Sequence, residues 1–313
     1  MEYIVAGYNM LTDIFYADGR KLENTPGGSF YSASGVKYWR DSLSYIGTAG
    51  PDFEHWYGEW FRRNAIDCRV TPCLPKTLKY TLTYRSDGIW TEACSYGEEY
   101  ERMAKDIGRL TPEMFAEAAG ENCRGIYIEA SLSAKIADDF PRIKALIPDA
   151  LLMWEINGDD LRNRASHAAI EERIAQVDAF SLNFDEAVGF FATEDKTAIL
   201  RGIAAFRKPC FFRQGELGAG IICGEVSVFA PAVGVGQSVD PTGCGNCSTA
   251  AAMVALSEKR EYEEAVAMAN LAAAACAAQF GPFPCVNEES RAEAEKKLTA
   301  FRAKANYVYG RLL

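Results

Sequence analysis

The sequence predicts an α/β protein with a doubly wound, mostly parallel sheet that is flanked by helices and carries a small β-lid. Short apolar runs alternate with helical stretches along most of the chain. This alternation is typical of βαβ units, which build parallel sheets covered by helices on both faces. An amphipathic hairpin near the end of the first third of the chain interrupts the alternation and predicts the lid.

The predicted strands of the sheet are short apolar runs, and the first two, at 3–6 and 43–46, both stop at a glycine. Aromatic residues then recur at helical spacing over 53–61 after Pro51-Asp52, which predicts a helix whose aromatic stripe packs into the core. The further strands are expected at 126–128, 151–156, 180–182 and 210–212. The further helices are expected near 133–145, 161–176, 194–206, 245–257, 261–279 and 287–304.

The hairpin shows a period of two from Leu78 to Tyr84, with apolar and polar side chains in alternation. A turn at 86–88 and a returning run at 89–94 complete an antiparallel pair with one solvated face. We expect the lid to consist of this hairpin, at roughly 76–94, and an earlier segment at roughly 11–27. Since no repeat, linker or low-complexity tract divides the chain, we expect a single domain over 1–313.

Composition excludes several classes of function. The 313 residues are 49% hydrophobic and carry a net charge of −10, which disfavours a broad nucleic-acid or anionic-membrane surface. No run approaches the ~18 apolar residues of a membrane-spanning helix, and the first residues do not resemble a signal peptide. The ten scattered cysteines are then expected as reduced thiols, and the protein is predicted to be cytoplasmic.

The richest local pattern is the segment 239–246, Val-Asp-Pro-Thr-Gly-Cys-Gly-Asn, which leads into an alanine-rich helix. Two glycines before a helix leave backbone N–H groups free at its positive end, where an anion can bind. A helix cap that holds no ligand is the alternative interpretation.

This segment resembles the carboxyl-terminal signature of the ribokinase-like (PfkB) carbohydrate kinases, D-T-x-G-A-G-D. Asp240, Thr242, Gly243 and Gly245 are in register, whereas Asn246 stands where that family has its catalytic aspartate. Five further segments resemble the family in the right order, so that the similarity spans residues 3 to about 290. They are 7–13, 25–28, 46–58, the N-x-x-E motif at 183–186, and 214–219, which resembles the T-x-G-x-x-G loop near the nucleotide with Arg213 at the usual threonine position.

The resemblance implies transfer of a phosphoryl group from ATP to a hydroxyl of a sugar or sugar-like molecule. The implied catalytic residues are Gly243, Cys244 and Gly245, which surround the phosphoryl group, and Asn246, which orients the hydroxyl. The implied substrate-binding residues are Asp13, Gly27, Gly28 and Ser32. The implied nucleotide-binding residues are Gly215, Gly218 and Asn270. Asn183 and Glu186 are implied for Mg²⁺, and Asp240 and Thr242 for a monovalent cation such as K⁺.

An asparagine amide accepts no proton at neutral pH, so Asn246 cannot act as a general base. Loss of a positioned base typically costs ~10²–10⁴-fold in rate. Three alternatives stay open: a slow kinase, a catalytically impaired protein that binds nucleotide or sugar and acts in regulation, or a kinase whose base comes from elsewhere. Asp13 is the candidate for that base because the resemblance assigns it to the substrate pocket.

Other signals are weaker. Cys244 and Cys247 form a C-x-x-C without a second pair for zinc, although a thiol at a helix start can be reactive. Gly234-Val235-Gly236 is too short for a dinucleotide fingerprint, so an oxidoreductase is the weakest rival. Glu155 and Asn157 lie where the predicted strand 151–156 ends, and they line either the cleft or a turn. The substrate, the choice of ATP or ADP, and a homodimer through the lid edge are left open.

Overall fold

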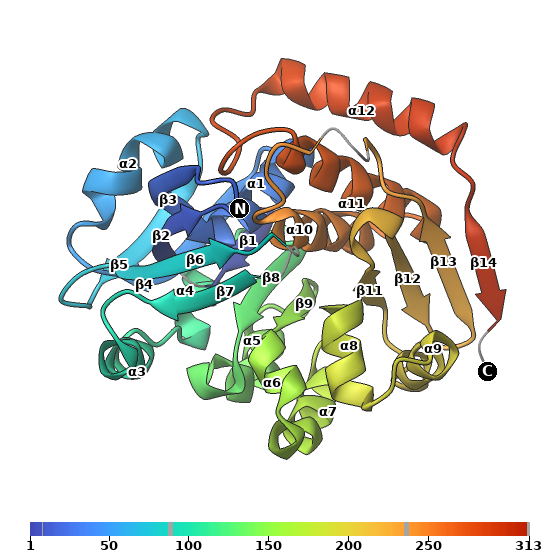
Figure 1. Cartoon of the computed structure of the whole chain (residues 1–313), viewed down its shortest axis with the longest axis horizontal. Helices are drawn as coiled ribbons and strands as arrows, with labels where there is room; N and C mark the ends of the chain where they lie inside the picture. Colours follow the sequence, from blue (N-terminus) through green and yellow to red (C-terminus); the bar gives the residue numbers. More distant parts are fainter. Residues whose placement is uncertain (8, 87–89, 235–237, 312–313) are drawn as a thin grey trace.

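The computed structural model describes residues 1–7, 9–86, 90–234 and 238–311. Within them the chain forms one large sheet with helices on both faces and a second, smaller sheet (Figure 1). Residues 87–88 of the predicted turn, and Val235 and Gly236, lie outside the described residues. No helix of the described residues is long and apolar enough to cross a bilayer.

The large sheet has ten strands among the described residues, in the order β14-β13-β12-β11-β10-β9-β8-β1-β4-β5. The strands from β11 to β5 pair in parallel, and β12, β13 and β14 extend the edge in antiparallel pairs. The predicted doubly wound, mostly parallel sheet is confirmed. The strands are β1 (Tyr3–Ala6), β4 (Leu43–Ala49), β5 (Asp67–Pro72), β8 (Gly125–Ala130), β9 (Leu151–Ile156), β10 (Ala179–Asn183), β11 (Cys210–Arg213), β12 (Ala219–Cys223), β13 (Val226–Ala230) and β14 (Val308–Arg311).

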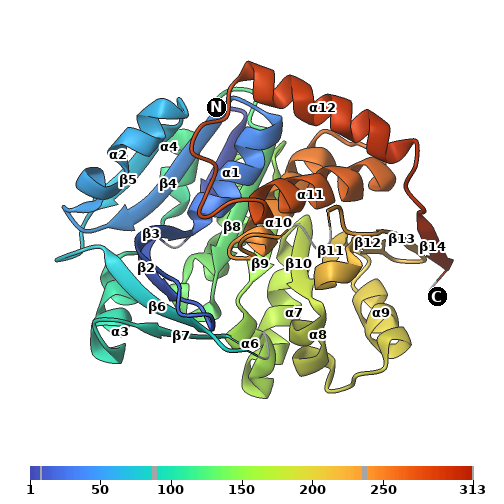
Figure 2. The same cartoon turned by 45° about the horizontal axis from the view of Figure 1, so that its top comes forward.

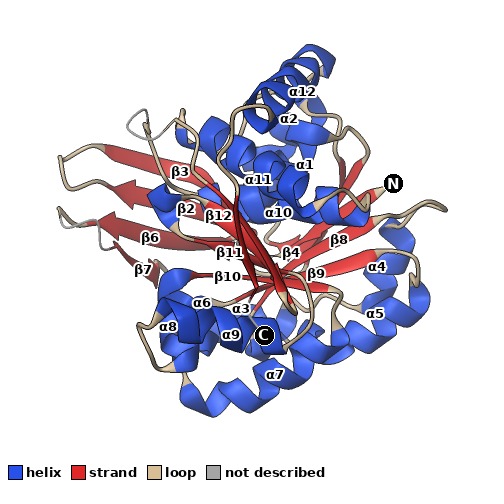
Figure 3. Ribbon diagram, turned by 90° about the vertical axis from the view of Figure 1, so that its right-hand side faces the viewer, coloured by secondary structure: helices blue, strands red, loops and turns tan. Residues whose placement is uncertain are grey.

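Helices cover the two faces of this sheet in separate layers (Figure 3). Because successive strand residues point to opposite faces, Tyr3 and Val5 pack into one core and Ile4 and Ala6 into the other. The first layer is α1 (Ser29–Trp39), α2 (Phe53–Arg63), α10 (Cys244–Ser257), α11 (Tyr262–Ala277) and α12 (Glu288–Arg302). The second is α4 (Pro112–Ala118), α5 (Phe140–Leu146), α6 (Gly158–Arg162), α7 (His167–Gln176), α8 (Phe184–Phe191) and α9 (Lys196–Ala205).

Two predicted helices are interrupted. The one expected near 133–145 consists of two 3₁₀ turns, Leu132–Ala134 and Ile136–Asp139, before α5 begins. Lys135 between the turns has a φ of 60°, which an α-helix cannot accommodate. The helix expected near 161–176 is divided into α6 and α7 because Asn163 bends the chain and accepts a hydrogen bond from the N–H of Ala165.

The smaller sheet has the order β3-β2-β6-β7. Its strands are β2 (Asn9–Phe15), β3 (Lys21–Gly28), β6 (Leu78–Tyr84) and β7 (Trp90–Cys94), and the last two form the predicted antiparallel pair. Leu78, Tyr80 and Leu82 are buried, and part of this face packs on α3 (Glu98–Ile107) through Ala104. When the top of the molecule is turned forward, the smaller sheet lies beside the part of the large sheet that contains β4 (Figure 2).

Candidate functional site at the start of α10

The glycine-rich segment forms the start of α10 and packs closely against α1. Gly243 is the N-cap and has a φ of 75°, a left-handed conformation that favours glycine. A Cβ atom at Gly243 would lie 2.0 Å from the ring of Tyr31, so the close packing also excludes a side chain. The start of α1, which contains the predicted substrate residues Gly28 and Ser32, therefore meets the predicted anion-binding turn.

The side chain of Arg213 connects the glycine turn with two carboxylates. A Cβ atom at Gly245 would lie 2.3 Å from Arg213 Nη1. The same nitrogen is 2.8 Å from Glu155 Oε1, and Nη2 is 3.5 Å from Glu186 Oε2. Burial alone would lower the pKa of the guanidinium, but the charges of Glu155 and Glu186 outweigh burial and raise it. Residues 155, 186, 213 and 245, which come from four separate segments, thus form one cluster in which Glu155 is buried and the other three are partly buried.

Asn246 lies between this cluster and a further carboxyl group. Its Nδ2 donates to the hydroxyl of Tyr127 at 3.3 Å, and that hydroxyl donates to Glu155 Oε2 at 2.5 Å. On its other side, Asn246 lies close enough to Glu129 to lower the pKa of that carboxyl group. Two of the residues around Asn246, Tyr127 and Glu129, come from β8.

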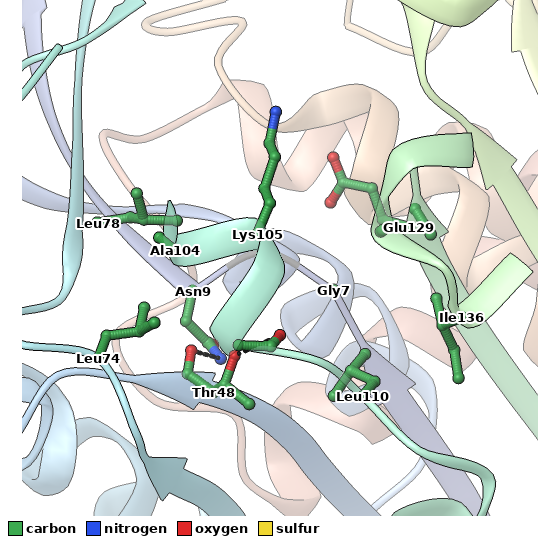
Figure 4. A pocket seen from close by; sticks show the side chains of 13 residues that line it. Gly7, Asn9, Thr48, Leu74, Leu78, Ala104, Lys105, Leu110, Glu129 and Ile136 are labelled. Carbon is green, nitrogen blue, oxygen red and sulfur yellow. Dashed lines mark hydrogen bonds between the residues drawn. The ribbon is translucent and has the colours of Figure 1, made fainter. Parts of the chain in front are cut away.

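No ion pair joins Glu129 to a cation within the described ranges of the chain. Burial, followed by the charges of Glu155 and Glu92, raises its pKa to about 8, although Asn246 and the charge of Arg213 act in the opposite direction. Its Oε2 is buried and has no hydrogen-bond partner among the described residues. The side chain lines a pocket (Figure 4).

This pocket has a volume of about 50 Å³ and lies between the ends of β1, β4 and β8, the strand β6 and the helix α3. Its lining includes Asn9, Thr48, Leu78, Lys105 and Glu129. Carboxyl ends of parallel strands are where doubly wound sheets bind ligands. Ligand sites are typically ~300–1,000 Å³, so the pocket as it stands is too small for a sugar.

The predicted substrate residues Asp13, Gly27, Gly28 and Ser32 do not line the pocket. Asp13 on β2 forms an ion pair with Lys79 at 2.9 Å and accepts from the N–H of Asn24 at 2.9 Å. Burial tends to raise the pKa of Asp13, but these hydrogen bonds and the charge of Lys79 outweigh burial and lower it. A carboxylate that is held ionised by a lysine is a weak proton acceptor, which argues against Asp13 as the substitute base.

Gly27, Gly28 and Ser32 lie where β3 passes into α1. A Cβ atom at Gly27 would lie 2.3 Å from Thr12 Oγ1, so this glycine lets two strands approach closely. Gly28 has a φ of 57° and is the N-cap of α1. Ser32 is fully buried within α1.

The predicted metal-binding residues form two separate pairs. Asn183 and Glu186 form a capping box at the start of α8, in which each side chain accepts from the backbone N–H of the other. Asp240 is buried and accepts from Thr242 N and Oγ1 through Oδ1, whereas its Oδ2 has no partner among the described residues. An orphaned carboxylate oxygen and the oxygen-rich donor set suit a hard cation. No cluster of three or more His, Cys, Asp or Glu side chains suited to a metal occurs in the part of the chain that the structure describes.

The predicted nucleotide-binding residues lie on the side of α11. Gly215 and Gly218 have φ values of 57° and 99° and bracket the 3₁₀ turn Gly215–Leu217 after β11. Asn270 on α11 is buried, and its Nδ2 donates to the carbonyl oxygens of Ala230 at 3.1 Å and Pro231 at 3.0 Å. Its amide group therefore anchors the segment after β13 to α11.

Cys244, at the start of α10, is a poor nucleophile in this environment. A hydrogen bond with Cys276 and burial raise its pKa far above the ordinary range of a thiol. All ten cysteines are free. These findings argue against the reactive or metal-binding thiols considered from the C-x-x-C pattern.

The sequence patterns did not predict three features of the site. These are the positions of Glu129 and Tyr127 beside Asn246 and the ion pairs of Arg213. Glu155 was considered as a cleft residue and lies in the cluster. Glu129, like Glu155, is an acidic residue at the end of a short apolar run. The pattern that indicates Glu155 as a cleft residue therefore also indicates Glu129.

The comparisons with known proteins agree with this arrangement. Residues 155–289 match the family model described as pfkB family carbohydrate kinase. No curated protein was found to match the sequence.

Solved structures match almost the whole chain. The adenosine kinase from Sinorhizobium meliloti has a TM-score of 0.75 at 18% identity, over 94% of this chain and 98% of its own. The Arabidopsis thaliana ribokinase complexed with ribose and ATP has 0.71 at 18%, over 95% and 98%. The Burkholderia thailandensis nucleoside kinase in complex with inosine has 0.73 at 18%, over 96% and 97%. These similarities show the fold, and residues 155–289 of this chain resemble the pfkB family of carbohydrate kinases.

Proposed function

We propose that this protein is an ATP-dependent kinase that phosphorylates a hydroxyl of a sugar, nucleoside or similar small molecule. One observation carries the proposal: Arg213 joins the glycine turn at Gly245 to Glu186 of the N-x-x-E motif. Phosphoryl transfer depends mainly on positioning and charge stabilisation, and this arrangement sets the guanidinium of Arg213 beside the start of α10, the positive end of the helix dipole. The family match and the kinases of the same fold support the reaction class.

In this proposal the amides of Gly243 to Gly245 hold the transferred phosphoryl group, and Asn246 orients the acceptor hydroxyl. Asn183 and Glu186 would hold Mg²⁺, which neutralises phosphate charge when bound. The unpartnered Oδ2 of Asp240, with Thr242, would hold a monovalent cation such as K⁺. Gly215, Gly218 and Asn270 would border the nucleotide.

The smaller sheet would act as the lid over the substrate. A volume of about 50 Å³ does not admit a sugar, so substrate entry requires a movement of β2, β3, β6 and β7 away from the large sheet. Asp13, Gly27, Gly28 and Ser32 would then border the enlarged site. We retain the single domain over 1–313 and lid segments near 11–27 and 76–94 as part of this proposal.

The test measures ADP release with ATP and Mg²⁺ across a panel of sugars, polyols and nucleosides, with isothermal titration of ATP in parallel. The wild type is compared with Asn246→Asp, and reactions without acceptor correct for hydrolysis. We expect acceptor-dependent ADP release by the wild type. ATP binding without turnover by the wild type, combined with turnover by Asn246→Asp, would instead identify an impaired kinase that serves as a binding protein. Absence of ATP binding in both would refute the kinase.

A further inference from the structure

Asn246 leaves the site without its expected proton acceptor, and Glu129 is the nearest carboxyl group that could replace it. Glu129 lies beside Asn246, lines the pocket at the carboxyl ends of the strands, and has a buried oxygen without a partner in the described structure. The other acidic side chains beside the cluster are engaged. Glu155 accepts from Arg213 and Tyr127, and Glu186 accepts from the N–H of Asn183 and pairs with Arg213.

We propose that Glu129 is the general base that takes the proton from the acceptor hydroxyl, while Asn246 orients that hydroxyl between Glu129 and the glycine turn. This inference rests on the proposed kinase function. The acceptor oxygen forms a bond to the γ-phosphorus of ATP, and the bond between that phosphorus and the β,γ-bridging oxygen breaks. The electron pair of the broken bond leaves with ADP, and the hydroxyl proton passes to the Glu129 carboxylate. Charge and atoms balance without any further reactant.

The surroundings of Glu129 suit this role. Glu155 on β9 and Glu92 on β7 repel its negative charge, while Arg213 on β11 attracts it. Lys105 on α3 lines the same pocket. These charges and burial together raise the pKa of Glu129 to about 8. A general base is most efficient when its pKa lies near the working pH, and this value is close to neutral pH. The proton acceptor is therefore displaced from the start of α10 to the end of β8.

The test is a pH–rate profile of the wild type, Glu129→Gln, Asn246→Asp and the double variant on the best acceptor from the panel. Glutamine is nearly isosteric with the protonated side chain, so we expect Glu129→Gln to fold and to bind ATP with unchanged affinity. We expect its kcat to fall by ~10²–10⁴-fold. The wild-type kcat/KM should rise with pH through an apparent pKa near 8, and this rise should be absent in Glu129→Gln.

The double variant separates catalysis from structure. If an aspartate at 246 supplies the missing base, the kcat of Glu129→Gln/Asn246→Asp should be at least tenfold higher than that of Glu129→Gln. The rise of kcat/KM with pH should also move to lower pH, because aspartate ordinarily titrates near 3.9. Glu117→Gln, at an exposed position on α4, serves as the matched control and should behave as the wild type.

Contrary results are distinct. A Glu129→Gln enzyme with wild-type kcat and an unchanged pH limb would overturn the role of Glu129 and leave the kinase function standing. Turnover by Asn246→Asp alone, with a silent wild type, would likewise show that Glu129 does not act as the base. If no variant binds ATP, both proposals fail.

Discussion

The two sides of Asn246 hold their carboxyl groups in opposite ways. On one side Glu155 and Glu186 share the buried guanidinium of Arg213, and Tyr127 completes their hydrogen bonds. On the other side Glu129 faces a pocket and repelling charges. Paired buried charges fix geometry, whereas an unpaired carboxyl with a raised pKa is the kind of group that exchanges protons at neutral pH. The difference separates a rigid side of the site from a reactive one.

The largest effect should come from removing the charge that organises the rigid side. Arg213→Met leaves Glu155 and Glu186 buried without a counter-charge, which should cost about 3–5 kcal/mol of unfolding free energy at pH 7. Urea denaturation followed by circular dichroism measures this loss. Arg162→Met is the matched control, because Arg162 pairs with the exposed Asp159 and should change stability by about 0–1 kcal/mol. Equal losses in the two variants would contradict the distinction.

The second effect is a pH dependence of stability that originates on the reactive side. The unfolded chain releases the proton of Glu129 near the ordinary glutamate pKa of about 4.3, whereas the folded chain retains it up to about pH 8. Between these values the folded state binds more protons at Glu129, so the contribution of Glu129 to stability is greatest at low pH and is lost as the pH rises towards about 8. The contribution of Glu129 should be on the order of 3 kcal/mol between pH 5 and 8.

Glu129→Gln removes this titration, so its unfolding free energy should fall less over that range than that of the wild type. Glu117→Gln should keep the full dependence. Urea midpoints at pH 5, 6, 7 and 8 give the comparison, and parallel curves for the wild type and Glu129→Gln would show that Glu129 titrates normally.

The smallest effect concerns the connection between the two sides. Tyr127→Phe removes the hydroxyl that bonds to Glu155 and to Asn246, which should cost about 1–3 kcal/mol because the buried Glu155 and the half-buried Asn246 each lose a bond. Tyr38→Phe is the control, because its hydroxyl has no hydrogen-bond partner in the described part of the chain. Differential scanning calorimetry should find the first variant less stable. Identical melting temperatures would remove Tyr127 from the network.

The sequence predicted what depends on neighbouring residues. The runs ending at Gly7 and Gly47, the hairpin alternation from Leu78, and the glycine turn before α10 each have a local pattern. What it could not predict depends on contacts between distant segments. The meeting of Arg213 with Gly245 and Glu155 requires the sheet order, and β14 pairs with β13 across about eighty residues of helical chain. The interruption at Lys135 depends on one backbone angle that no periodicity reveals.

The close packing of α1 on α10 makes these two helices a single mechanical unit. A Cβ atom at Gly35 would lie 2.1 Å from the carbonyl oxygen of Cys247, so the backbones touch with no side chain to cushion a relative displacement. The first helix has its N-cap at Gly28, at the end of β3 in the smaller sheet, and the second has its N-cap at Gly243 in the glycine turn. In the proposed kinase, a shift of one helix on acceptor binding would displace the other helix, which would couple the acceptor to the glycine turn.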